Sequence, residues 1–324
     1  MIQGLALCPD ITWDKWLKMY KFDKKHFFHY MIFDYVILKD IKPELSGYIT
    51  ASIGLMSGSG YPDDKAVHDI RVYMKQARAA LKLIRPFLDE DIYKKEYDAY
   101  RETGRLLSAW RDTAVQRKTL KSFRKADPGL FKNLSEDVKV KVLLSKQDSM
   151  DDDASDKEKR SSEINDILRK ALFRLRFLSL AGSTMDPEIL LGQLEKTYLG
   201  AGEIYLRCRN NIKPECVHEL RKACKDLLYQ VGFFRSLNPS VIKKFEKALD
   251  SLAQDLGKYN DLHQLITSLD YKYKSNKNPA LHKLVIMIRD RQDQYLSRVW
   301  PSAYKIFCPG RSLLNVLGYK VVVL

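Results

Sequence analysis

Apolar and polar positions repeat along this chain with the period of an α-helix. One apolar stripe recurs at spacings of three and four residues, as Ile70, Met74, Ala77, Leu81 and Ile84. This spacing places the side chains on one face of a helix that turns about 100° per residue. The stripe returns 150 positions later, without a change of register, as Leu220, Cys224, Leu227, Val231 and Phe234. The sequence therefore predicts two helices of the same design, each with one face in a core.

The same periodicity predicts helices over most of the remaining chain, at residues 43–57, 92–107, 109–125, 164–180, 188–211, 239–257, 260–269 and 280–299. Asp63 or Asp64 is expected to cap the first of the two matching helices. Residues 138–142 alternate like a strand, but Ser135 followed by two acidic residues is typical of a helix start, so a helix is favoured. Residues 319–324 are expected to be a short strand or a packed tail.

A long-period repeat and a change of composition indicate how the chain is divided. Trp110-Arg111-Asp112 and Tyr259-Asn260-Asp261 lie 149 positions apart, close to the offset between the two stripes. A repeat of this length indicates duplicated helical subdomains rather than a solenoid. Residues 146–162 are polar and acidic, and we expect a weakly ordered linker there. The predicted domains are an aromatic-rich N-terminal segment docking on the core (1–42), two helical bundles (43–145 and 163–324) and this linker.

Net charge narrows the class of partner. The 324 residues include 56 Lys and Arg against 41 Asp and Glu, a formal net charge of +15 with a pI near 9.4. A polyanion is therefore expected: nucleic acid, an anionic membrane surface or a phosphate polymer. The most apolar stretch, residues 27–38, is too short to span a bilayer and contains His29 and Asp34. Because no secretory signal is recognisable either, we expect a soluble, cytoplasmic protein.

The sequence shows no recognisable catalytic or metal-binding motif. Its five cysteines are an odd number without a CxxC pair or zinc spacing, so we expect free, mostly buried thiols in a reducing compartment. The segment from Gly54 to Gly60 lacks the Lys-Ser/Thr of a P-loop. No carboxylate cluster suited to Mg²⁺ accompanies the basic residues described next. We therefore expect a binding protein without a metal or cofactor, not an enzyme.

Basic side chains form a separate row on the first of the two matching helices: His68, Arg71, Lys75, Arg78, Lys82 and Arg85, within roughly 100° of arc. No acidic residue lies in this row, although acid one turn away would relieve the like-charge repulsion. Another helix aligns Arg111, Lys118, Lys121 and Lys125. A single basic row is usually a solvated face, but the repetition and the missing countercharge favour anion binding. Cations about 5.4 Å apart, one per helical turn, suit a chain of phosphates.

The pattern His-x-x-Arg with further cations at helical spacing begins at His68 and again at His218. Together with the two repeated segments near Asp112 and Asp261, it resembles the CHAD domain, the conserved histidine α-helical domain, over residues 43–324. The resemblance implies an all-α fold of two pseudo-symmetric bundles, duplicated four-helix units, around a central basic channel that binds inorganic polyphosphate. The positions that match the family are His68, Arg71, Lys75, Arg78 and Lys82, followed by His218, Arg221, Lys222, Lys225 and Tyr229.

Two positions depart from the family pattern, because Leu228 and Asn260 stand where arginines are expected. The anion is therefore expected nearer the first half. With Arg111 and Lys118 added, these residues predict non-catalytic binding of polyphosphate, in the cytoplasm or at polyphosphate granules. The alternatives are a phosphohydrolase or phosphotransferase acting on polyphosphate or triphosphate, and a non-specific nucleic-acid binder. Nucleic acid is disfavoured because the rows carry few aromatics on which bases could stack. The two histidines are either structural or phosphate ligands, and the sequence does not specify the oligomeric state.

Overall fold

The computed structural model describes residues 41–57, 62–134, 140, 143–144, 154–178, 187–269, 278–308, 310 and 312–317, apart from the side chains of 109–114, 154–157 and 187. Its helices are α3 (Ile41–Met56), α4 (Asp64–Ile84), α5 (Glu90–Leu106), α6 (Ser108–Ala126), α7 (Pro128–Asn133), α9 (Ala154–Arg176), α10 (Pro187–Asn210), α11 (Pro214–Val231), α12 (Pro239–Ser268), α14 (Pro279–Ile306) and α15 (Leu313–Val316), with 3₁₀ turns η2 (Arg85–Phe87) and η3 (Gly232–Phe234). The described residues contain no strand, which confirms the all-α prediction. Residues 1–40 of the predicted N-terminal docking segment, most of residues 135–153 and the tail at 319–324 lie outside the described residues.

Helix α4 begins where its sequence predicts. The Asp63 carboxylate accepts a hydrogen bond from the backbone N–H of Ala66 at 2.7 Å, and Asp64 adds an acidic side chain to the first turn. The apolar stripes of α4 and of α11 are both buried, from Ile70 on the first helix to Phe234 just beyond the second. The two predicted core-facing faces are therefore confirmed.

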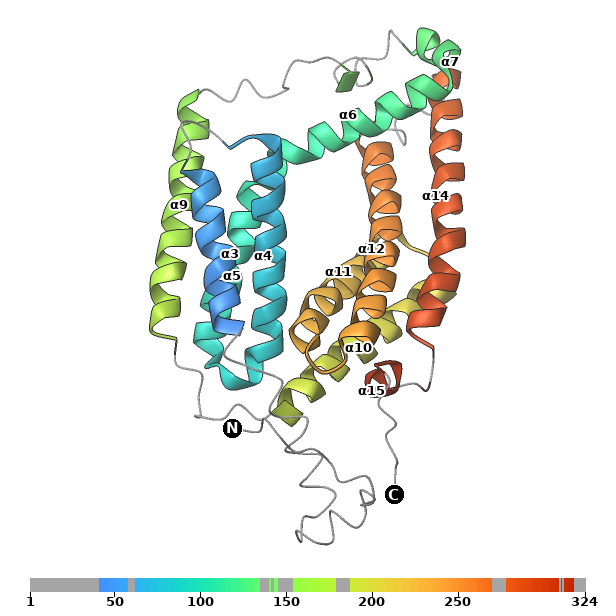
Figure 1. Ribbon diagram of the computed structural model, residues 1–324. Coiled ribbons are helices and arrows are strands. Elements are labelled where there is room, and N and C mark those ends of the chain that lie inside the picture. The colour runs from blue at the N-terminus through green and yellow to red at the C-terminus, as the bar shows by residue number, and fades with distance from the viewer. Residues whose placement is uncertain are drawn as a thin grey trace, which may run out of the picture.

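Helices α3, α4, α5 and α9 form one side of the molecule (Figure 1). Because α9 begins at Ala154, residues 154–162 are helical, and the predicted linker is wrong over this part. The helix packs on α3 and α5, although its residues from 163 onward were expected in the second bundle. Arg174 on α9 forms an ion pair with Glu96 on α5, whose side chain is 2% exposed. Lys42 also donates hydrogen bonds to the backbone carbonyls of Arg176 and Leu178.

Helices α10, α11, α12 and α14 form the other side (Figure 1). The prediction of two helices at 239–257 and 260–269 is wrong, because α12 runs unbroken from Pro239 to Ser268. Its buried stripe continues through Leu256, Tyr259 and Leu262, so packing stabilises the helix across Gly257. Helix α14 likewise continues past its predicted end at residue 299 to Ile306, with Pro301 inside it.

Helix α6 crosses between the two sides at the upper end of the view in Figure 1. It packs against α5 where it begins and against α12 and α7 further along. A second, smaller core gathers Leu120 and Phe123 of α6 with Leu265 of α12 and Leu284 of α14. Helix α6 therefore connects the two sides through side-chain packing as well as through the chain.

The larger core passes from α3 and α4 through α11 to α12 without a break. Helices α4 and α11 touch directly, since the Gln230 side-chain amide donates a buried hydrogen bond to the Ala79 carbonyl at 3.0 Å. The two sides thus share one core, and the pseudo-symmetric relation between them stays a prediction. None of the described helices is both long and apolar enough to cross a membrane.

The expectation of free thiols is wrong for two cysteines. Cys208 at the end of α10 and Cys216 at the start of α11 form a disulfide, with their Cα atoms 5.6 Å apart. Cys224 is a free thiol buried in the α11 stripe, and Cys308 is a free, partly exposed one. The disulfide closes the turn between two antiparallel helices, a contact that cysteine counting does not reveal.

Candidate anion-binding site

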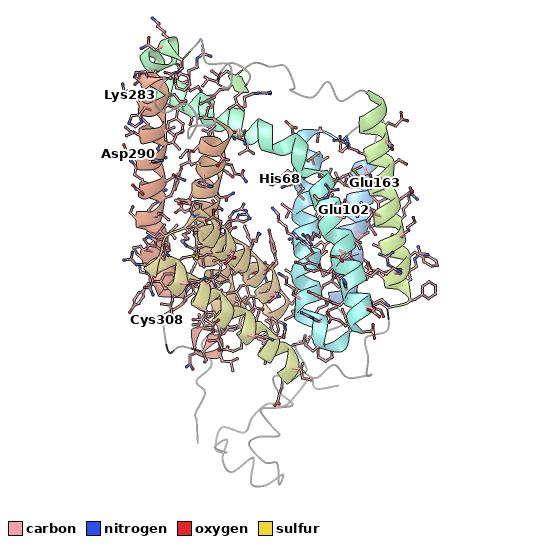
Figure 2. All side chains as sticks on the ribbon, turned by 180° about the vertical axis from the view of Figure 1, so that it is seen from behind. His68, Glu102, Glu163, Lys283, Asp290 and Cys308 are labelled. Atoms are coloured by element: carbon pink, nitrogen blue, oxygen red, sulfur yellow. A yellow bond between two sulfur atoms is a disulfide. The ribbon has the colours of Figure 1, made fainter. Side chains whose placement is uncertain are left out.

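The basic row of α4 stands at the edge of the core. Each of its five matched residues is half-buried, because the neighbouring apolar stripe holds that side of the helix against α3, α5 and α11. Figure 2 places His68 in the part of α4 beside which α6 begins. Arg71, one turn further, donates from Nη1 to the Gly104 carbonyl of α5 at 3.0 Å. The row therefore starts next to the junction of α5 and α6.

An aromatic side chain of α5 supports the second part of the row. The guanidinium of Arg78 lies 5.8 Å from the centre of the Tyr97 ring, and Nζ of Lys82 lies 5.7 Å from the same ring. Arg78 also donates from Nε to the Met74 carbonyl one turn back, at 3.3 Å. Contacts of this kind stabilise a cation without neutralising it, so Arg78 keeps its charge available at the surface.

The second row lies on α11 and is positioned by α12. The guanidinium of Arg221 rests on Gly257, where an added Cβ atom would lie 3.0 Å from Nε. An alanine there would require the guanidinium to shift by a few tenths of an ångström. Next to it, Lys222 is exposed to solvent. The sequence indicated Gly257 as the end of a helix, whereas its role is to admit Arg221.

His218 occupies the first turn of this row, close to the cations of both helices. Burial lowers its pKa, and the charges of Lys222, Arg221 and, from α4, Lys75 lower it further, while a hydrogen bond with Asn260 acts in the opposite direction. Nδ1 of His218 and Nε of Arg221 are buried without a hydrogen-bond partner among the described residues. The two rows therefore converge on a region of concentrated positive charge.

The predicted lack of countercharge is wrong at one end of each row. Nζ of Lys82 lies 2.6 Å from Oδ2 of Asp226 on α11, and Nζ of Lys225 lies 2.8 Å from Oδ1 of Asp250 on α12. Arg85 likewise pairs with Glu90 beyond the end of α4. These carboxylates all come from other helices, Glu90 being the first residue of α5, so comparing positions within one helix could not find them.

The ion pair between Lys82 and Asp226 joins the two rows. Burial acts to lower the pKa of Lys82, but the charge of Asp226 and its hydrogen bond outweigh burial and raise it. Burial also raises the pKa of Tyr229, with Arg221 acting to lower it and with Asp250 and Asp226 reinforcing the increase. Tyr229 therefore lies close to Arg221 as well as to the two carboxylates. Leu228 beside it packs on the core.

The remaining predicted residues lie on α6. Lys118, Lys121 and Lys125 are exposed on this helix, while the side chain of Arg111 lies outside the described residues. The contacts of α6 run to α4, α5, α7 and α12, and its exposed lysines form no ion pair with a described carboxylate. They add exposed positive charge on a helix that packs against α4.

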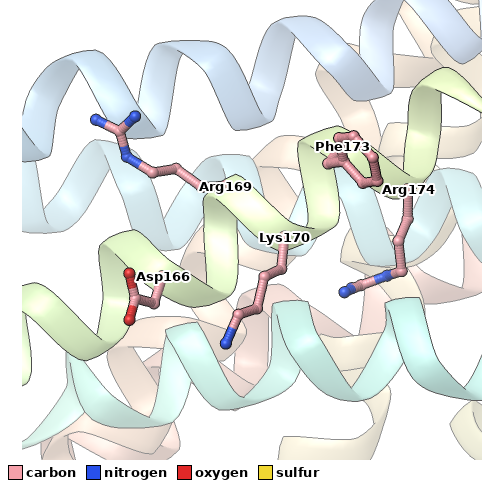
Figure 3. Close-up of a pocket in the computed structure, with 5 residues that line it drawn as sticks. All are labelled: Asp166, Arg169, Lys170, Phe173 and Arg174. Atoms are coloured by element: carbon pink, nitrogen blue, oxygen red, sulfur yellow. The ribbon is translucent and has the colours of Figure 1, made fainter.

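A cavity of about 420 Å³ on α9 lies away from these rows (Figure 3). Asp166, Arg169, Lys170, Phe173 and Arg174 line it. None of the predicted site residues is among them, and Arg174 is already paired with Glu96. Within the described part of the chain, no group of three or more His, Cys, Asp or Glu residues is placed to hold a metal ion.

An all-helical fold in which two helices with basic rows pack against each other defines a class of helical proteins. Comparison with known families is more specific: the family model described as the CHAD domain matches residues 57–270. The chain therefore belongs to the CHAD domain family, as its paired His-x-x-Arg helices predicted. It is also similar to the crystal structure of the CHAD domain from the plant Ricinus communis, with 16% identity over 84% of this chain and 90% of that chain and a TM-score of 0.49. No curated protein matches the chain.

Proposed function

We propose that the protein binds inorganic polyphosphate, without hydrolysing it, along the converging basic rows of α4 and α11. The observation that carries this proposal is the position of His218, where cations of its own helix and Lys75 of α4 act on one half-buried imidazole. Such a concentration of positive charge is unfavourable in the free protein, and a multiply charged anion would relieve it.

A linear phosphate polymer fits the geometry of the rows. Successive cations stand about 5.4 Å apart along each helix, and each phosphate unit of such a polymer carries about one negative charge. Arg78 and Arg221 offer planar forks for two oxygens, whereas Lys222 offers a mobile point charge. No described carboxylate pairs with these three side chains. They are therefore the best candidates for direct phosphate contact.

The test is a binding titration at several salt concentrations with long-chain polyphosphate and with single-stranded DNA and RNA of equal total charge. We expect polyphosphate to bind tightest, with an affinity that falls steeply with salt because counterions are released on binding. Equal affinity for all three polymers would instead indicate a non-specific polyanion binder. Release of phosphate on adding Mg²⁺ or Mn²⁺ would overturn the non-catalytic assignment and favour a phosphohydrolase.

A matched pair of variants locates the site. Arg78→Gln with Lys222→Gln removes one open cation from each row. The negative slope of log K against log salt should become shallower by about 1.4, about 0.7 per lost contact. Lys159→Gln with Arg169→Gln removes the same charge from exposed positions of α9, which does not pack on α11. The control should change the slope far less. Equal losses in both variants would place the anion elsewhere.

A further inference from the structure

Two carboxylates occupy the ends of the basic rows, where a continuous cationic track would otherwise extend. Asp226 holds Lys82 of α4, and Asp250 holds Lys225 of α11, at N–O distances of 2.6 and 2.8 Å. Each lysine also stands over an aromatic ring, Lys82 over Tyr97 and Lys225 over Tyr229. The same local arrangement of lysine, ring and carboxylate therefore occurs once in each row.

These pairs lie at the surface rather than in the core. The exposed fraction of the side chains is 36% for Lys82 and 22% for Asp226, and 25% for Lys225 and 43% for Asp250. Water and an incoming anion can therefore reach them. Ion pairs this accessible contribute little to folding, because solvent screens the attraction. A structural role alone does not explain why both rows carry one.

Hydrogen bonds and helix packing hold both carboxylates next to the lysines. Asp250 accepts a hydrogen bond from the Gln254 side-chain amide at 2.8 Å in addition to its bond from Lys225. Asp226 is fixed by the contact of α4 with α11, where Gln230 donates to the Ala79 carbonyl one turn beyond. A phosphate could reach Lys82 or Lys225 only by displacing a fixed carboxylate or by binding beside its negative charge.

We propose that Asp226 and Asp250 act as anionic stops, which restrict a bound polyphosphate to the open parts of the two rows and so limit its contact length and affinity. The inference rests on the proposed function. It identifies two acidic residues, on α11 and α12, as determinants of how much of a polymer the site engages. Each row is thereby divided into an open part, around Arg78 and Arg221, and a closed part at Lys82 and Lys225.

The test replaces each stop by its uncharged isostere. Asp226→Asn with Asp250→Asn retains the side-chain shape and one acceptor oxygen per residue, but it removes the negative charge and so releases two lysines. If each lysine then contacts one phosphate, the slope of log K against log salt should steepen by about 1.4, and affinity at 0.15 M salt should rise about tenfold. The control, Asp91→Asn with Asp166→Asn, makes the same change in net charge at exposed positions of α5 and α9. It should leave the slope at the wild-type value.

Long-chain polyphosphate is the probe, and circular dichroism checks the fold of each variant. If the wild-type protein binds polyphosphate but the double variant keeps the wild-type slope, the stops are refuted and the proposed function stands. If the wild-type protein does not bind, the proposed function fails first. Because Asp226 also joins α4 to α11, Asp250→Asn alone is the second variant. It leaves that contact intact and should steepen the slope by about 0.7, and an unchanged slope there would refute the inference as well.

Discussion

Replacing Gly257 by alanine tests whether this glycine positions Arg221 for anion binding. In the interior of α12, the exchange should by itself stabilise the helix by about 1 kcal/mol, because alanine loses less backbone entropy on folding. The new Cβ atom, however, would lie 3.0 Å from Nε and 3.4 Å from Nη2 of Arg221. Nε and Nη2 belong to the same planar guanidinium, so the group must shift as a whole by a few tenths of an ångström away from α12. We expect the gain in helix stability to be largely cancelled and the affinity for polyphosphate to fall several-fold.

Gly200→Ala in α10 is the matched control, because a Cβ atom there meets nothing within 4 Å. Chemical denaturation should show the full gain of about 1 kcal/mol for this variant, with polyphosphate binding unchanged in the same titration. The difference between the two variants measures the effect of moving Arg221. Equal stabilisation by both exchanges, with wild-type affinity in both, would refute the argument that Gly257 positions the arginine.

Three further predictions concern the fold and the pH response. Arg174→Ala leaves the Glu96 carboxylate buried without its partner, so the free energy of unfolding should fall by about 3 kcal/mol, measured by urea denaturation; a loss below 1 kcal/mol would contradict the ion pair's role. Reducing the Cys208–Cys216 disulfide should lower the free energy of unfolding by about 2.5 kcal/mol, because it releases a short closed loop; equal stability with and without reductant would argue against this. Burial and neighbouring cations lower the pKa of His218, so the free protein should lose stability as pH falls below about 6.5, where the unfolded chain takes up the proton more readily. Bound polyphosphate favours the protonated imidazole, so affinity should rise over the same range, and His218→Gln should reduce both effects; a pH response identical to wild type would place them on another group.

The elements that depend on local pattern could be predicted from the sequence. Two apolar stripes in the same register located α4 and α11, and their burial follows directly from the spacing of residues such as Ile70 and Leu220. The cap at Asp63 is equally local. The family resemblance, which the CHAD match confirms, likewise rests on short patterns within single helices.

The features that were missed depend on contacts between helices. The carboxylates of Asp226 and Asp250 neutralise lysines on another helix, so the charge within one helix could not reveal them. The sequence predicts a helix end at Gly257, but packing of the neighbouring residues Leu256, Tyr259 and Leu262 continues α12 through it, and this packing outweighs the small helix propensity cost of glycine. The polar composition of residues 154–162 predicts a linker, but these residues begin α9. The contacts of α9 with α3 and α5, which composition does not reveal, stabilise the helix.

The path of the chain through α6 and α9 has a consequence for how the protein folds. The chain leaves the first side at α6, whose packing needs α12 and α14, and returns with α9 to complete the group of α3, α4 and α5. During synthesis, α6 therefore emerges long before α12 and α14. Its apolar residues Leu120 and Phe123 cannot be buried in the small core until those helices have been made. Contacts so distant in sequence slow folding because a long loop must close first. Because α6 packs in the small core with α12 and α14, and the larger core is shared by both sides, the two sides are expected to fold in one cooperative step rather than one after the other.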